Sequence, residues 1–232
     1  ARSFFADSTE QFDLVSFGLL DAHTMTSLSN ARLDHYIYTR ESIAQAHSLL
    51  KPDGLLSMSF AANQLYLIDR LAHTLQEEFG HEPLVFLHPN SHFGFGAYMF
   101  IAGNLDMANS NLAAKPRLNQ HIEELKALER KFLPLDGKTV QEWIPYKTKI
   151  ATDDWPYLYL SGPSVPLLFF ILAVLVFLLI PLLQVMVGGQ RIVTTRWTRS
   201  HLHFAFLGAG FLLLEVQNIS KASVVLGNTW LV

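Results

Sequence analysis

The sequence predicts an α/β domain followed by transmembrane α-helices. Two observations indicate this fold class. Up to about residue 103, short apolar runs alternate with stretches of helical periodicity, which is typical of a three-layer α/β sheet with mostly parallel strands. Later in the chain, residues 165–187 form an apolar stretch without a charged side chain, long enough to cross a bilayer as a helix.

Two helices are predicted between the strands. Residues 41–50 carry apolar side chains at helical spacing, and Thr39 precedes them as a candidate N-cap. The Pro-Gly-containing turn of residues 51–54 is expected to end this helix. Residues 64–80 form a second amphipathic pattern, which closes at Gly80.

Four strands are predicted in the same part of the chain. Residues 12–20 form an apolar run that suits a buried parallel strand and ends at Asp21. Residues 55–62 form the second strand, and residues 83–88 and 95–103 form a closing hairpin that adds an antiparallel strand. Because ligands of such sheets bind at the carboxyl ends of the strands, Asp21 is the first candidate for a functional residue. Capping of the turn after the strand is the alternative role for its carboxylate.

Composition excludes several kinds of site. The chain has no cysteine, which rules out disulfides, Cys-zinc sites and a cysteine nucleophile. Its net charge of −3 and the absence of a long basic run argue against nucleic acid as a partner. His88 and His92 are four positions apart, but they flank a proline in a turn and lack an evident third ligand, so no metal site is predicted.

Four motifs in the first part of the chain resemble spermidine synthases, enzymes with a class I S-adenosylmethionine-type fold. They are FDLVSFGLLD, IYTRES, LLKPDG and the hairpin sequence SHFGFGAYMF. The resemblance implies that this part is the C-terminal half of a Rossmann-like class I methyltransferase/spermidine synthase fold. It implies S-adenosylmethionine or decarboxylated S-adenosylmethionine as cofactor.

The same resemblance identifies Asp21 with the acid that holds and deprotonates the attacking amine, and makes it the predicted catalytic residue. A carboxylate at this position can pair with a polyamine or another small cationic substrate and accept a proton as the nitrogen attacks. The sequence DAHT has one acid where the family has two, and it lacks the family's proline, which puts polyamine specificity in doubt. The glycine-rich cofactor turn belongs to the earlier half of such folds, so the cofactor-binding residues are unknown.

The second part of the chain predicts membrane spans at about residues 165–187 and 202–219, with a third beginning near residue 222. Glu215 interrupts the second span, where a carboxylate in hydrocarbon costs about 2.5–3.5 kcal/mol, so an intramembrane polar site is predicted. Asn218 shares the face of Glu215, and Lys221 is expected to pair with Glu215 from another helix or to reach the interface. A position of Glu215 near the headgroups is the alternative.

Two later motifs resemble bacterial integral-membrane proteins that fuse a spermidine synthase-like domain to transmembrane helices. They are TDDWPYLYL and GAGFLLLEVQNISKASVVLGNTW. In the first motif, Asp153, Asp154, Trp155 and Tyr157 are predicted to form an interfacial element at the membrane boundary, because Trp and Tyr are enriched there. Closure of the two acids over the α/β cleft as a lid is the alternative.

The predicted organisation has three parts: a partial α/β domain at 1–103, a linker at 104–162 and membrane helices at 163–232. The chain is expected to be an internal or C-terminal fragment of a bacterial inner-membrane protein, with the lipid bilayer as a partner and the α/β domain in the cytoplasm. The basic loop of residues 188–200 favours the opposite orientation.

Two functions fit these predictions. The first is a membrane-anchored enzyme that transfers an aminopropyl or methyl group from an S-adenosylmethionine-type donor, with no turnover expected from this chain alone. The second is a non-catalytic transporter or sensor whose α/β domain binds a ligand.

Overall fold

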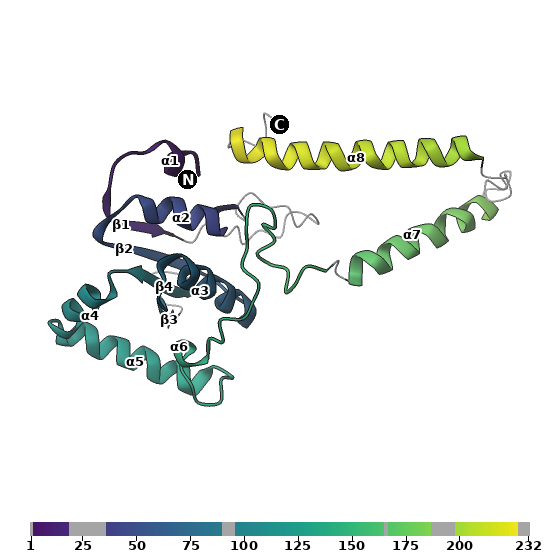
Figure 1. The fold of residues 1–232 in the computed structure, drawn as a ribbon. Coiled ribbons are helices and arrows are strands. Elements are labelled where there is room, and N and C mark those ends of the chain that lie inside the picture. Colours follow the sequence, from purple (N-terminus) through teal and green to yellow (C-terminus); the bar gives the residue numbers. More distant parts are fainter. Residues whose placement is uncertain (1, 19–35, 90–95, 165–166, 187–197, 227–232) are drawn as a thin grey trace. The chain divides into compact units, whose positions relative to one another are not determined.

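The computed structural model describes residues 2–18, 36–89, 96–164, 167–186 and 198–226. These residues fall into two compact units, Ala1–Gly162 and Pro163–Val232, referred to as unit 1 and unit 2. Figure 1 shows a mixed α/β arrangement in unit 1 and two helices in unit 2.

Unit 1 contains a four-stranded sheet and six of the described helices. Its elements in chain order are α1 (Arg2–Asp7), β1 (Phe12–Phe17), α2 (Arg40–Ser48), β2 (Leu50–Phe60), α3 (Leu65–Phe79), β3 (Leu84–His88), β4 (Ala97–Gly103), α4 (Leu105–Ala113), α5 (Pro116–Phe132) and α6 (Val140–Trp143).

The sheet has the strand order β1-β2-β4-β3. Strand β1 pairs in parallel with β2, and β4 is antiparallel to both of its neighbours, β2 and β3. Three of these four strands therefore run in one direction, and β4, the second strand of the predicted hairpin, runs against them. Only one of the three strand pairs is parallel, so the prediction of a mostly parallel sheet is wrong and the sheet is mixed; the expected antiparallel strand is β4.

Helices α2 and α3 supply much of the core that covers one face of the sheet. Along β2, Leu56, Met58 and Phe60 are fully buried and alternate with half-buried residues, which is the pattern of a strand with one well-covered face. The predicted cap of the first helix is confirmed, because Thr39 accepts a hydrogen bond from the backbone N–H of Ser42. Helix α3 ends as predicted at Gly80, which adopts the left-handed conformation.

The turn predicted at residues 51–54 is wrong. This segment continues β2, and the pairing of β1 with β2 shifts register between Phe12 and Leu14, so the Pro-Gly sequence forms an irregularity within the strand. In the neighbouring strand β4, Gly103 lies against this irregularity with a φ of 110°. A Cβ at Gly103 would lie 2.4 Å from the carbonyl oxygen of Gly54, so the close approach requires glycine.

The outer strand β3 is covered by side chains from helices α5 and α6. The buried Glu129 accepts hydrogen bonds from the backbone N–H groups of Leu87 at 2.5 Å and Val140 at 2.9 Å. Gln141 accepts from the N–H of Val85 at 2.6 Å. Burial raises the pKa of Glu129, and its two backbone hydrogen bonds lower it in part. These side chains satisfy donors that an edge strand would otherwise expose.

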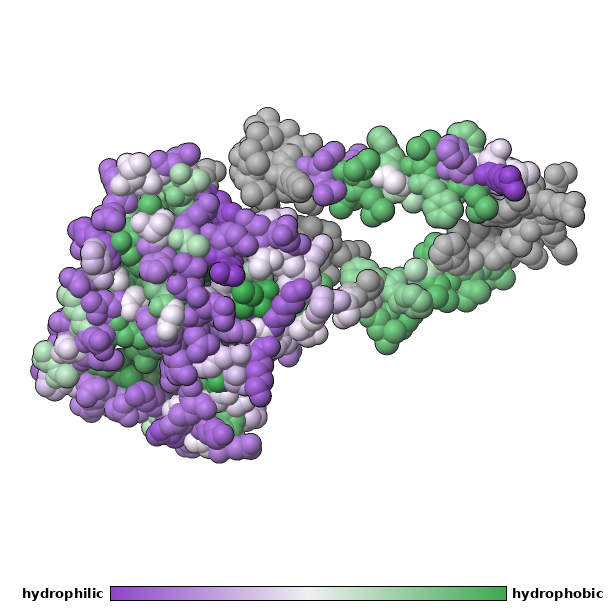
Figure 2. Space-filling model, in the orientation of Figure 1, coloured by the Kyte–Doolittle hydropathy of each residue, from purple (hydrophilic) through white to green (hydrophobic). Residues whose placement is uncertain are grey.

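Unit 2 contains α7 (Leu167–Met186) and α8 (Arg199–Leu226). Apolar side chains are exposed along α7, among them Leu167, Phe170 and Leu178, and Figure 2 shows this apolar surface in green. In α8, residues 204–214 are all apolar or glycine, with Phe206 and Leu213 exposed, and His203 and Glu215 flank this run.

The predicted transmembrane α-helices and the predicted location in a bacterial inner membrane are wrong. Across the described ranges, the structure contains no helix that combines the length and the apolarity needed to span a bilayer. The described helix α7, Leu167–Met186, lies within the predicted window 165–187. The second predicted span and the described start of the third, up to Leu226, lie in one continuous helix, α8, and the sequence between residues 219 and 222 has no proline or glycine to end it.

We expect Glu129→Ala to lower the free energy of unfolding of unit 1 by about 2–4 kcal/mol, because two buried backbone donors lose their acceptor. Glu123→Ala on the exposed side of the same helix should leave it nearly unchanged. Urea denaturation followed by circular dichroism compares the two variants. Equal stability of both would contradict the role assigned to Glu129.

Candidate functional site

The carboxyl ends of β1 and β2 define the edge of the sheet where ligands of parallel α/β folds bind. Strand β1 ends at Phe17, and after Gly18 the described residues resume at Tyr36, shortly before α2. Asp21, the predicted catalytic residue, lies outside the described residues, so its role stays a prediction. The site must therefore be built from the residues that the structure places at this edge.

A segment far along the chain is fastened to this edge. We call residues 144–161 the strap. At its first end, the buried carboxylate of Asp69 on α3 accepts hydrogen bonds from the backbone N–H groups of Tyr146, Lys147 and Thr148 at 2.7, 3.2 and 2.8 Å, and from the Thr148 hydroxyl at 2.5 Å. One side chain thus fixes three successive peptide units of the strap.

The next residue of α3 holds the rest of the strap through its carbonyl groups. The guanidinium of Arg70 donates from Nε to the carbonyl of Lys149 at 2.7 Å, and from its terminal nitrogens to those of Tyr157, Leu158 and Ser161. Arg70 has no exposed surface. We call Asp69 and Arg70 the clamp, because the acid binds N–H groups and the base binds carbonyl groups of the same strap.

Aromatic rings complete the surroundings of Arg70. Its guanidinium carbon lies 5.4 Å from the ring centre of Tyr66 and 5.1 Å from that of Trp155. Burial lowers the pKa of Arg70 to about 10, which leaves the group charged at neutral pH. The Tyr66 hydroxyl donates to the carbonyl of Tyr159 at 2.6 Å and adds another attachment of α3 to the strap.

The middle of the strap lies against the N-terminus of α2. The carboxylate of Asp153 forms a bidentate ion pair with Arg2, at 2.7 and 3.2 Å, and accepts from the hydroxyl of Thr39 at 2.7 Å. The N–H of Asp153 donates to Glu41 at 2.9 Å, and the N–H of Arg40 donates to the strap at 2.9 Å. These contacts place Asp153 at the carboxyl edge of the sheet.

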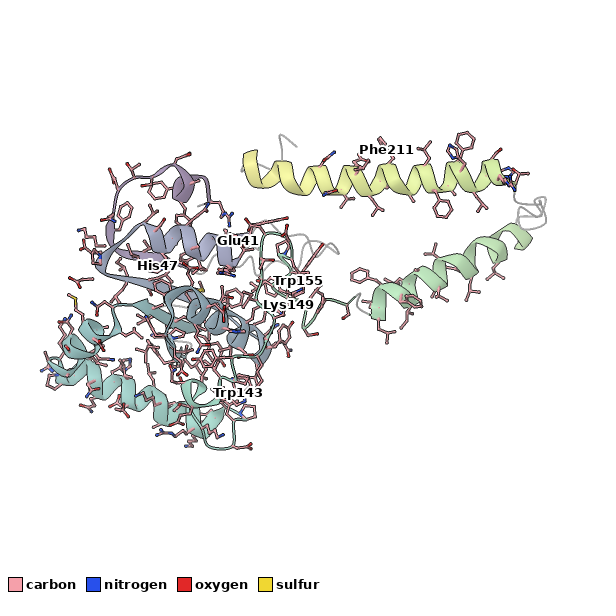
Figure 3. All side chains as sticks on the ribbon, viewed as in Figure 1. Glu41, His47, Trp143, Lys149, Trp155 and Phe211 are labelled. Atoms are coloured by element: carbon pink, nitrogen blue, oxygen red, sulfur yellow. The ribbon has the colours of Figure 1, made fainter. Side chains whose placement is uncertain are left out.

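Aromatic residues surround this acid. The rings of Trp155 and Tyr157 meet edge to face with their centres 6.0 Å apart. Burial raises the pKa of the Tyr36 phenol, and nearby Tyr157 and Asp153 raise it further by disfavouring a second negative charge. Figure 3 labels Trp155 and Lys149 on the strap and Glu41 on α2. The edge therefore combines carboxylates with aromatic faces, a set suited to a small cation.

The predicted site residues divide between the two units. Asp153, Asp154, Trp155 and Tyr157 all belong to the strap, where Asp154 is exposed and the contacts given above lie within unit 1. Their assignment to a membrane interface has no test here and stays a prediction.

The predicted polar residues of the second part lie on α8 in unit 2. Glu215 and Asn218 are exposed, and Lys221 belongs to the same helix. Their predicted joint role is likewise untested.

Sequence reasoning missed the clamp. Asp69 and Arg70 interrupt the apolar run of α3, yet both are buried on the face that packs in the core. A charged pair at core positions of an amphipathic helix was the signal that could have revealed them, because buried charges need partners. Arg2 and Glu41 carried no such signal, since their partners are distant in sequence.

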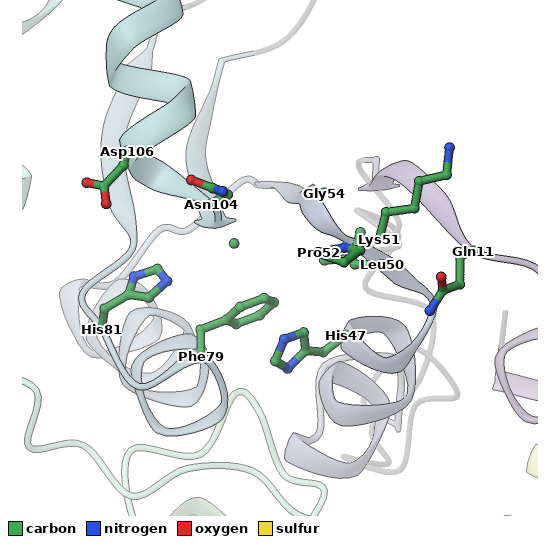
Figure 4. A pocket seen from close by; sticks show the side chains of 11 residues that line it. Gln11, His47, Leu50, Lys51, Pro52, Gly54, Phe79, His81, Asn104 and Asp106 are labelled. Atoms are coloured by element: carbon green, nitrogen blue, oxygen red, sulfur yellow. The ribbon is translucent and has the colours of Figure 1, made fainter.

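A hollow of about 520 Å³ lies at the opposite, amino edge of the parallel strands, between the ends of α2 and α3 (Figure 4). Three of its polar residues contact other side chains of unit 1. His47 contacts Glu78 at 3.2 Å, Lys51 pairs with Asp13 at 2.8 Å, and Asn104 donates to Asp53 at 3.0 Å. The site is therefore placed at the carboxyl edge.

Comparisons with known proteins add a distant similarity. No protein-family model matches the chain. No curated protein matches it. Among solved structures, it is similar to human methyltransferase-like protein 13 in complex with SAH, at 14% sequence identity and a TM-score of 0.32, over 44% of this chain and 43% of that protein. The chain thus spans less than half the length of that protein. We therefore infer function from the strap and its surroundings.

Arg70→Lys should release the strap, because an ammonium cannot replace a planar guanidinium that donates to several carbonyls at once. We expect a loss of about 3 kcal/mol in the free energy of unfolding of unit 1 and faster proteolytic cleavage within residues 144–161. Arg130→Lys is the matched control, since Arg130 pairs with Glu142 at the surface. Unchanged cleavage of the strap in Arg70→Lys would show that Arg70 does not hold it.

Proposed function

We propose that this chain forms the acceptor side of an enzyme that transfers an aminopropyl or methyl group from an S-adenosylmethionine-type donor to a small amine. The observation that carries the proposal is the position of the strap. It brings Asp153, Asp154, Trp155 and Tyr157 to the carboxyl edge of the sheet, beside the end of the strand that leads to Asp21. The resemblance of the sequence motifs to spermidine synthases supplies the reaction class.

The arrangement at this edge supports a cationic acceptor. Alkylammonium groups bind to carboxylates and to the faces of Trp and Tyr rings. Asp153 is already paired with Arg2, whereas Asp154 is exposed and faces solvent. We assign Asp154 and the aromatic rings to binding of the acceptor, and Asp153 to fixing the strap on α2.

In the proposed reaction the acceptor nitrogen uses its lone pair to attack the carbon bonded to the sulfonium sulfur of the donor. The carbon–sulfur bond breaks, its electron pair stays on sulfur, and a neutral thioether leaves. Before the attack, the bound ammonium gives a proton to the carboxylate of Asp21, which frees this lone pair; the nitrogen is positively charged again once the new bond has formed. This assignment of Asp21 is part of the proposal.

The location of the donor is part of the same proposal. Strand β1 is the outer strand of the described sheet on the side away from β3. In open α/β folds the ligand crevice lies where the strand order reverses, and a further strand beside β1 would create such a point at the end of β1. We therefore expect amine binding by this chain alone, and turnover once a donor-binding part accompanies it.

Calorimetric titration tests the proposal with S-adenosylmethionine, decarboxylated S-adenosylmethionine, putrescine and uncharged 1,4-butanediol. We expect putrescine to bind and 1,4-butanediol not to bind. Asp21→Asn should weaken putrescine binding about tenfold, because a charge-assisted contact is lost. Asp136→Asn, on the exposed loop between α5 and α6, is the control with the same charge change and should bind as the unaltered chain does.

Equal affinity for putrescine and 1,4-butanediol would refute a cationic acceptor. Equal putrescine affinity of Asp21→Asn and Asp136→Asn would remove Asp21 from the site.

A further inference from the structure

Trp155 is held in place from within the protein. The Arg70 guanidinium lies 5.1 Å from the ring centre, and Arg70 is itself fixed by carbonyl groups of the strap. The backbone N–H of Trp155 donates to the carbonyl and to the hydroxyl of Thr152, at 3.0 and 3.1 Å. A ring fixed in this way loses little conformational freedom when a ligand contacts it.

A second cation also contacts this ring. The ammonium nitrogen of Lys149 lies 4.6 Å from the ring centre of Trp155, closer than the guanidinium. Arg70 is buried, whereas Lys149 is exposed to solvent (Figure 3). The lysine side chain is therefore able to leave the ring and move into water, and the arginine is not. An exposed contact of this kind is weak and easily exchanged.

The groups around the ring favour replacement of Lys149 by another ammonium. Tyr157 meets Trp155 edge to face, and the exposed carboxylate of Asp154 precedes Trp155 in the strap. Tyr157 and Asp153 are both close enough to Tyr36 to raise the pKa of its phenol. A cation that leaves the ring thus vacates a face of Trp155, whose ring meets Tyr157 and whose neighbour in sequence is the exposed Asp154.

We infer that the Trp155 ring face occupied by Lys149 is an ammonium-binding subsite, and that Lys149 is an intramolecular competitor for it. An alkylammonium ligand binds by taking the place of the lysine ammonium on the ring. The inference rests on the proposed function for the identity of the ligand. It adds that the Trp155 ring binds one amine group of this ligand, and that the Lys149 side chain limits its affinity. Lys149 also raises the selectivity for cations, because an uncharged ligand cannot replace the cation–π contact between Lys149 and Trp155 that its binding removes.

Calorimetric titration of the full chain with putrescine and with n-butylamine, protonated at pH 7, tests this inference. Lys149→Gln should bind both amines about two- to fivefold more tightly, since the competing contact is absent. Lys149→Arg keeps a competing cation beside the ring and should bind both amines less tightly than Lys149→Gln does. Trp155→Leu should weaken binding at least about fivefold, and Trp155→Phe should fall between Leu and Trp.

Lys147→Gln controls for charge alone. It removes the same charge from a neighbouring exposed position of the strap. Equal tightening by Lys147→Gln and Lys149→Gln would overturn the competitor role, because the effect would then come from net charge. Urea denaturation of each variant identifies any loss of fold, and Trp155→Phe keeps the test valid if Trp155→Leu unfolds.

The two proposals fail in different ways. In one outcome, both amines bind and the variants change their affinity as expected, but neither donor binds and no group is transferred even with a donor-binding part present. The subsite is then supported and the proposed reaction is refuted. If amine affinity does not respond to Lys149→Gln or Trp155→Phe, the subsite falls and the reaction class stands. Absence of amine binding in both the unaltered chain and Lys149→Gln overturns both.

Discussion

The guanidinium of Arg70, buried on α3, is the contact on which the geometry of the carboxyl edge depends. Moving a charge away from water costs several kcal/mol, and this cation is stabilised by strap carbonyls and by the faces of Tyr66 and Trp155. Its pKa falls only to about 10, so it stays charged at neutral pH. Removing the strap would leave the buried charge without most of its partners. Helix α3 and the strap therefore stabilise each other in one arrangement.

Asp69 complements Arg70 in attaching the strap to α3. An acid that accepts from N–H groups stands next to a base that donates to carbonyl groups, so two adjacent residues satisfy both kinds of backbone group in one extended segment. A third attachment, between Asp153 and Arg2, fixes the middle of the strap beside α2. Between these points the strap presents Lys149, Trp155 and Tyr157 on its outer side. Contacts of α3 and Arg2 with the strap thus make the site rigid, and the side chains of Lys149, Trp155 and Tyr157 supply its chemistry.

The elements of unit 1 were largely predictable because their signals are local. Helical periodicity and Gly80 identified α3, and Thr39 marked the start of α2. The segment at residues 51–54 was misread because Pro and Gly indicate turns in isolation, whereas the pairs Phe12–Leu50 and Leu14–Leu55 on either side keep it within β2 as an irregularity.

The site was less predictable, because its contacts join distant residues: Arg70 and Leu158 are 88 positions apart. The aromatic and acidic composition of residues 151–160 suits a membrane interface and a folded strap equally well. Its contacts in the fold, such as Trp155 against Arg70 and Asp153 with Arg2, show its place in unit 1. The membrane prediction rested on apolar windows, on the aromatic residues of 151–160 and on the resemblance to membrane proteins, and α8 runs without a break from the second window to Leu226.

Hydrogen exchange with mass spectrometry, with and without putrescine, tests the central claim that the strap is a fixed amine-binding element at the carboxyl edge. Without ligand, the amides of Tyr146, Lys147 and Thr148 should exchange slowly, because Asp69 binds them. With putrescine, exchange should slow further in peptides covering residues 149–157 and stay unchanged in β3. Strap amides that exchange as fast as those of an unfolded peptide, or protection by putrescine elsewhere in the chain but not in the strap, would contradict the claim.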